Sequence, residues 1–433
     1  IILIMEKRYI PHILFPKYYQ EKLSLGIKDN LNFNFDKHTG FNQPTELENL
    51  SNRLKHNTNK KIERLKKLEE YLNEKQIEII DNIKIFDFTK NRFIGKWIVE
   101  EHNIGKGWTN GWRKIYEILF RFKFLKNMDN LKHFDICGYP GAFILGTNHY
   151  IKTHTKIKNY DWFIQSYNQT QEDTTSNYLN DSYGLHQKYP DRFLFGSKKS
   201  NYSGDITDRN NILEYYNKFK DDKMDLVTSD CGLRLDFDIA YMREQQMSKI
   251  FFGQLICGLM VLKKGGNLVM KTYSQFEPWS ISLLYLITQL FENVYLCKPE
   301  SSRFSSGKEI YIIGENNLDV LDTKDFDKLL DILESFENDK DLNKTILSID
   351  KMNKEIINNI VAIVNDYYTK NFKRVKVSRK IIYSYNYLTK NPEEYIKNLK
   401  DYEYFTTKIK RRFYHNYFIR MEYKKINAED KLL

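Results

Sequence analysis

Cysteine is scarce in this sequence, with four among its 433 residues. No two of them form a Cys-x-x-Cys pair, and none lies near a histidine at the spacing of zinc ligands, which argues against a disulfide framework and a zinc site. We expect buried thiols in a reducing, intracellular compartment, the cytoplasm or the nucleus. The four residues are Cys137, Cys231, Cys257 and Cys297.

Long hydrophobic runs are also missing. The longest, Phe251–Leu262, contains Gly and Gln and is far shorter than the roughly 20 apolar residues that span a bilayer. We therefore expect no membrane helix and no membrane partner. The opening Ile1–Met5 is apolar but lacks a basic region and a small-residue cleavage site, so it does not predict a signal peptide.

The positive charge of the chain is concentrated at one end. The net charge is +11, from 68 Lys and Arg against 57 Asp and Glu. Residues 315–366 carry 6 lysines and 13 acids, whereas residues 370–433 carry 17 basic and 7 acidic residues. This asymmetry predicts a module boundary and a tail that binds something anionic. The basic, aromatic stretch Lys408–Tyr414 is typical of RNA contacts, although a solvated helix face would have the same composition.

The length predicts two or three modules at roughly 100–200 residues each. Apolar residues at helical spacing over about 45–83 predict a helical N-terminal extension, residues 1–100. Residues 101–318 alternate short apolar runs with amphipathic segments, which predicts a doubly wound, mostly parallel α/β sheet of the Rossmann-like type. Residues 319–433 are predicted to be a helical C-terminal region with a basic end. The expected strands are His133–Cys137, Trp162–Ile164, Met224–Val227, Asn267–Met270, Val294–Cys297 and Ile310–Ile313, and the expected helices include Asn211–Phe219, Glu244–Leu262 and Pro278–Phe291.

A turn containing glycine and proline follows the first expected strand, within Phe134–Phe143. In doubly wound sheets, ligands bind where the first strand gives way to its helix, and Gly138 and Gly141 would let the backbone approach one. The turn is neither G-x-G-x-x-G nor a P-loop, which argues against a Rossmann dehydrogenase and a nucleoside triphosphatase. Taken alone, the turn could equally have glycine and proline only because the backbone geometry of the turn requires them. Asp205 could likewise accept a hydrogen bond from adenine or cap the following helix.

Two lysines and two carboxylates lie at the ends of predicted elements. Lys114 lies on a helix before the first strand, Asp230 and Lys271 end two strands, and Glu309 opens another. Because strand carboxyl ends face the crevice of such sheets, we expect Asp230 and Lys271 in one cleft. Each residue alone could be a solvated strand-end charge, but the set together favours function.

Such a set suits the deprotonation of a weak acid such as a ribose hydroxyl. A lysine whose ammonium form is destabilised by burial and by a second lysine can titrate near neutrality and act as a base. The two carboxylates would hold it in place, and the design needs no metal.

The segment from Trp108 to Asn316, about half of the chain, resembles the FtsJ-like ribose 2′-O-methyltransferases. The closest likeness is to the Adrift-type branch, which contains the eukaryotic enzyme for the second transcribed nucleotide of capped mRNA and a homologue in African swine fever-like viruses. The motifs that carry the resemblance occur in order: Pro140–Ile144, Asn148–Tyr150, Asp161–Trp162, Phe195–Gly196, Gly204–Ile206, Val227–Asp230, Gly265–Asn267, Lys271 and Lys298–Pro299.

The resemblance implies S-adenosylmethionine as methyl donor, RNA as substrate and a Lys-Asp-Lys-Glu tetrad. Carried over by motif, the tetrad falls on Lys114, Asp230, Lys271 and Glu309, with Lys271 as the base that takes the 2′-hydroxyl proton. Trp162, after the second strand, is expected near the cofactor ribose, and Asp205 near the adenine. The implied cofactor-binding residues are Gly138, Tyr139, Pro140, Gly141, Ala142, Phe143, Trp162, Gly204, Asp205, Ile206 and Asp230.

The sequence departs from the family at two places. Tyr139 stands beside the proline where many relatives have a smaller or acidic residue, and no acidic residue is identified for the cofactor ribose.

The resemblance implies the capped 5′ end of mRNA as the substrate, with other capping or transcription subunits as candidate partners. The alternatives are a ribosomal or transfer RNA 2′-O-methyltransferase and a non-catalytic RNA-binding scaffold that retains the fold.

Overall fold

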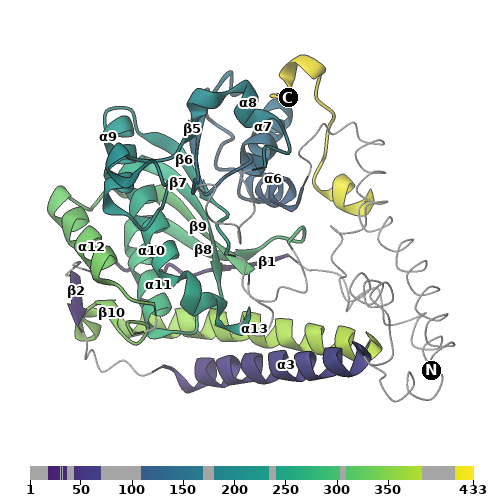
Figure 1. The fold of residues 1–433 in the computed structure, drawn as a ribbon, viewed down its shortest axis with the longest axis vertical. Helices are drawn as coiled ribbons and strands as arrows, with labels where there is room; N and C mark the ends of the chain where they lie inside the picture. The colour runs from purple at the N-terminus through teal and green to yellow at the C-terminus, as the bar shows by residue number, and fades with distance from the viewer. Residues whose placement is uncertain are drawn as a thin grey trace.

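Figure 1 shows the fold in a computed structural model. The structure describes residues 18–29, 31, 33–36, 43–69, 109–168, 180–233, 240–302, 309–338, 340–382 and 415–433. The predicted helix beyond residue 69 and the basic stretch Lys408–Tyr414 lie outside these residues. No helix within the described ranges has the length and apolar character needed to cross a bilayer.

A mixed sheet of eight strands forms the centre of the described molecule (Figure 1). Its order is β1-β8-β9-β7-β6-β3-β4-β5; the strands from β7 to β5 run parallel, and β9 is antiparallel to both of its neighbours. The mostly parallel, Rossmann-like sheet and its six predicted strands are thereby confirmed. The strands are β1 (Tyr19–Lys22), β3 (Asn130–Ile136), β4 (Asn159–Gln165), β5 (Phe193–Leu194), β6 (Met224–Ser229), β7 (Leu262–Tyr273), β8 (Phe291–Lys298) and β9 (Glu309–Asn317).

Helices cover both faces of this sheet because its buried strands carry apolar side chains on both sides (Figure 1). In β7, Val269 packs into the cluster with α6 and α7, whereas Leu268 and Met270 pack into the cluster with α9, α10 and α11. The helices are α3 (Thr45–Glu69), α6 (Asn110–Phe122), α7 (Ala142–His154), α8 (Leu185–Lys188), α9 (Arg209–Phe219), α10 (Arg243–Val261), α11 (Pro278–Leu290), α12 (Thr323–Ser335) and α13 (Lys354–Ile382).

The carboxyl ends of β3, β4 and β6 lie level with one another. Ile136, at the end of β3, pairs with Gln165 of β4 on one side and with Ser229 of β6 on the other. The chain passes from β3 to β4 on one side and later to β6 on the other, so this is the point where strand order reverses. Ligands of open α/β sheets bind at such a switch point.

The N-terminal and C-terminal regions contain strands as well as helices. β1 adds an antiparallel strand to the edge of the main sheet beside β8, and β2 (Phe33–Asp36) pairs with β10 (Thr345–Leu347) in a second sheet. Helices α3 and α13 lie side by side (Figure 1). The predicted helical extensions thus include α3 and α13, and the strands β1, β2 and β10 are additions that were not predicted. The domain boundaries at 100 and 318 remain predictions.

Candidate functional site

Lys271 and Asp230 form the centre of a buried polar cluster at the strand ends. Asp230 directly follows β6, and Lys271 lies in β7, which continues two residues beyond it. The Lys271 ammonium lies 3.0 Å from Asp230 Oδ1 and donates to the Asp230 carbonyl at 2.6 Å. Tyr311, the cross-strand partner of Lys271 on β9, donates its hydroxyl to Asp230 Oδ1 at 2.6 Å. Sequence reasoning missed Tyr311, which looks like an ordinary apolar strand residue.

Lys114 and Glu309 complete this cluster from two other elements. Lys114 lies on α6, and its ammonium is 3.0 Å from Glu309 Oε1 and 3.5 Å from Asp230 Oδ1. Glu309 is the first residue of β9, and Ser302 donates its hydroxyl to the same Oε1. The fold thus brings together all four charged side chains that were singled out from the sequence. Their catalytic roles remain a prediction.

The surrounding charges favour the ionised forms of Glu309 and Lys271. Burial alone would raise the pKa of Glu309, but the ammonium groups of Lys114, Lys298 and Lys271 hold it well below its usual value. Burial alone would lower the pKa of Lys271, but Asp230, Tyr273 and Glu309 raise it above its usual value. The expectation that Lys271 titrates near neutrality was therefore wrong for the protein without ligand, because the Asp230 carboxylate 3.0 Å away stabilises the ammonium form.

The turn after β3 brings the backbone close to the switch point. Gly141 is the N-cap of α7, and the first N–H groups of a helix have no partner within it. Gly138 must lack a side chain because an added Cβ would lie 2.2 Å from Asp135 Oδ2. Tyr139, Pro140 and Ala142 are half-buried at this turn, whereas Phe143 is buried in the core behind it. Phe143 therefore supports the turn from behind and offers a ligand only its backbone.

Gln165, at the end of β4, ties the turn after β3 to the loop that contains Gly204. Its side-chain oxygen accepts a hydrogen bond from the Cys137 N–H at 3.0 Å, and its amide nitrogen donates to the Gly204 carbonyl at 2.6 Å. Ile206 beside them is buried. Asp205 Oδ1 accepts hydrogen bonds from the backbone and hydroxyl of Thr207. The capping role left open for Asp205 is thus partly realised, although the N-cap of α9 itself is Asp208.

Asp135 places an unpaired buried oxygen beneath the glycine turn. Thr228 donates to its Oδ1 at 2.7 Å, while its Oδ2 has no hydrogen-bond partner among the described residues. Burial raises the pKa of Asp135 well above its usual value. An unsatisfied buried polar atom is costly, so a hydrogen-bonding group of a ligand in the turn would satisfy it. The glycine turn and this oxygen together fit a small ligand that has polar groups.

Trp162 does not lie where the sequence predicted. It lies inside β4, three residues before the end of the strand, and its side chain is buried against Tyr189 and Phe193. Arg192 covers its ring at 5.1 Å from the centroid. The side chain is therefore a core residue, and we withdraw it from the expected cofactor-binding set.

No group of three or more histidine, cysteine or acidic side chains within the described ranges has the arrangement of a metal site.

Comparison with known proteins gives matches over the part of the chain that contains this cluster. Residues 108–317 match the family model "FtsJ-like methyltransferase". "Probable methyltransferase EP424R" of African swine fever virus is 34% identical over 238 residues, which cover 53% of this chain and 54% of the relative. "Uncharacterized protein L511" of Acanthamoeba polyphaga mimivirus is 32% identical over 302 residues, 69% of this chain and 36% of the relative.

A third relative comes from an animal. "Cap-specific mRNA (nucleoside-2'-O-)-methyltransferase 2" of Drosophila melanogaster is 29% identical over 219 residues, 48% of this chain and 30% of the relative. The chain thus spans between about a third and about half of the length of these relatives. All three matches cover about half of the chain or more. Residues 108–317, just under half of the chain, therefore match the FtsJ-like methyltransferases, a family whose members take their methyl group from S-adenosylmethionine.

Proposed function

We propose that this protein is an RNA ribose 2′-O-methyltransferase that acts on the cap-proximal nucleotides of mRNA. The observation that carries the proposal is the buried cluster of two lysines and two carboxylates beside the switch point of an FtsJ-like domain. Its arrangement suits the removal of a proton from an alcohol. The similarity to a cap-specific mRNA methyltransferase supports the choice of substrate.

In this proposal, Lys271 accepts the proton of the ribose 2′-hydroxyl through its Nζ atom. Asp230 holds that nitrogen at 3.0 Å, and Lys114 with Glu309 balances the charge around it. S-adenosylmethionine supplies an electrophilic methyl group on sulfur. The protein's contribution is to align the hydroxyl, since positioning two reactants removes much of the entropic barrier.

The cofactor would bind at the turn after β3 and at the loop that Gln165 ties to it. Gly138, Tyr139, Pro140, Gly141 and Ala142 would contact its amino-acid end. The loop of Gly204, Asp205 and Ile206 would contact the adenine. Asp230 would lie near the methyl group, and Phe143 would contribute its backbone. We add Asp135, whose unpaired Oδ2 lies beneath the turn, and omit Trp162.

The proposed partners are capped RNA and other subunits of a capping or transcription machinery. An intracellular, cytoplasmic setting is proposed with them, since two of the curated relatives come from viruses. Further activities of the longer relatives are not assigned to this chain.

A methylation assay tests the substrate. The protein is incubated with labelled S-adenosylmethionine and with capped or uncapped RNA of the same sequence, and the RNA is then digested to locate the methyl group. We expect label on a 2′-oxygen next to the cap, in capped RNA only. Label in ribosomal or transfer RNA would favour the second substrate class. RNA binding without any transfer would favour a scaffold and contradict the proposal.

The pH dependence of transfer follows from the raised pKa of Lys271. Because the neutral amine is the base, its fraction grows about tenfold per pH unit at any pH below the pKa. We expect the single-turnover rate to rise steeply from neutral pH into the alkaline range, with saturating cofactor and RNA. A rate that is already constant between about pH 7 and 8 would show a lowered pKa and contradict this assignment.

A further inference from the structure

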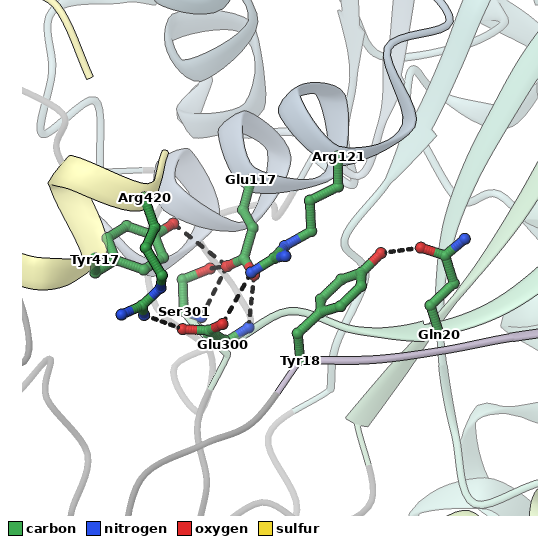
Figure 2. Close-up of polar contacts among 8 residues, drawn as sticks. All are labelled: Tyr18, Gln20, Glu117, Arg121, Glu300, Ser301, Tyr417 and Arg420. Carbon is green, nitrogen blue, oxygen red and sulfur yellow. Dashed lines mark hydrogen bonds and ion pairs between the residues drawn. The ribbon is translucent and has the colours of Figure 1, made fainter. Parts of the chain in front are cut away.

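Glu117 is a fully buried carboxylate one turn beyond Lys114 on α6. Five donors surround it (Figure 2). They are Arg121 Nε at 3.0 Å, the backbone N–H groups of Glu300 and Ser301 at 2.9 and 3.0 Å, the Ser301 hydroxyl at 2.8 Å and the Tyr417 hydroxyl at 3.3 Å. A buried charge with this many hydrogen bonds fixes the segments that supply them.

Three segments that are distant in the sequence meet at this carboxylate. Arg121 also binds Glu300 at 2.9 Å and stacks on Tyr18 near the N-terminus, 3.8 Å from the ring centroid. Arg420 binds the other oxygen of Glu300 (Figure 2). The loop after β8 is thus held to α6 and to the segment of residues 415–423, which we name the C-terminal strap.

The loop after β8 leads directly to the charged cluster. Ser302, next to Ser301, donates its hydroxyl to Glu309 Oε1, and that oxygen lies 3.0 Å from the Lys114 ammonium. Lys114 and Glu117 share the rigid helix α6. Glu117 therefore helps to fix the positions of both partners of this ion pair. It acts on Lys114 through the helix and on Glu309 through the loop.

We propose that Glu117 is a positioning residue for methyl transfer, and that the C-terminal strap takes part through the Tyr417 hydroxyl. This inference rests on the proposed function. Glu117 does not reach the crevice at β3, β4 and β6, so its loss should misplace Glu309 and Lys114 and leave cofactor binding intact. Small displacements of aligned groups reduce rates steeply.

The test compares Glu117→Gln, Ser302→Ala and Tyr417→Phe with a control, Tyr116→Phe. Tyr116 is buried on the same helix and bonds His154 and the strap at Met421, but these hydrogen bonds involve neither Glu117 nor the loop after β8. We expect kcat to fall at least about tenfold in Glu117→Gln and Ser302→Ala and less in Tyr417→Phe. The dissociation constant of S-adenosylmethionine should stay within about twofold, and the control should match the unaltered protein.

A second measurement needs no RNA. Lys114 is buried in its ion pair, so loosening the pair should speed its labelling by an amine-reactive anhydride, read by mass spectrometry. We expect faster labelling in Glu117→Gln and Ser302→Ala but not in Tyr116→Phe. Faster labelling in a protein that methylates no RNA would preserve the positioning role and refute the proposed function. Unchanged kcat and labelling, or equal losses in the control, would refute the positioning role.

Discussion

Replacing Lys271 with alanine is expected to lower methyl transfer at least about 100-fold, the size of a lost general base. The ammonium is buried and lies 3.0 Å from Asp230 Oδ1, so no water-exposed group can easily take its place. The proposed cofactor site lies mainly at the ends of β3, β4 and β6, so the affinity for S-adenosylmethionine should change little. Single-turnover rates and isothermal titration with S-adenosylmethionine measure the two quantities separately.

Two further variants separate a base from a mere positive charge. Lys271→Arg keeps the charge, but a guanidinium stays protonated in proteins, so we expect it to be as inactive as the alanine variant. Lys264→Ala, which removes an exposed lysine from the same strand, should retain full activity. Substantial transfer by Lys271→Arg would mean that the residue acts through its charge and that the base lies elsewhere.

Gly204→Ala is expected to lower the free energy of unfolding by about 2–5 kcal/mol. Gly204 has a φ of +62°, and an added Cβ would lie 1.9 Å from the Ser166 backbone oxygen. The left-handed conformation costs about 1–2 kcal/mol, and forcing atoms into a packed site adds about 1–3 kcal/mol. The loop that Gln165 ties to the glycine turn should shift, so cofactor affinity should fall as well. Urea denaturation gives the free energy of unfolding.

Gly265→Ala is the matched control for this substitution. Gly265 has a similar φ of +75°, but a Cβ there would meet nothing within 4 Å. It should therefore lose only the conformational part, about 1–2 kcal/mol, and keep its cofactor affinity. Equal losses in the two variants would show that the close approach at Gly204 is unimportant.

The sequence allowed much of the sheet and the charged cluster to be predicted, for one physical reason. Parallel strands buried on both faces appear as short apolar runs, and their carboxyl ends meet at one edge. A charge that follows such a run, as Asp230 does, must therefore lie at that edge. Glu309 joins it because β9 runs antiparallel, so that the start of this strand lies beside the far end of β7.

Other features depend on distances that a sequence does not contain. The direction of the pKa shift of Lys271 was predicted wrongly because it depends on how near Asp230 lies. Gln165 has no signal beyond its place at a strand end, yet its amide joins two loops. The position of Trp162 was predicted wrongly because a tryptophan near a strand end can face either a ligand or the core.

The short strand β1 has a consequence for how this protein can be handled. The backbone of β1 pairs with that of β8 from Tyr19↔Lys298 to Lys22↔Tyr295. Three of its four residues, Gln20, Glu21 and Lys22, are exposed. Polar and charged side chains on an outermost strand discourage pairing with other molecules. A shortened protein that began at residue 101 would bare the hydrogen-bonding groups of β8 and invite self-association, so the catalytic unit is best produced together with its N-terminal segment.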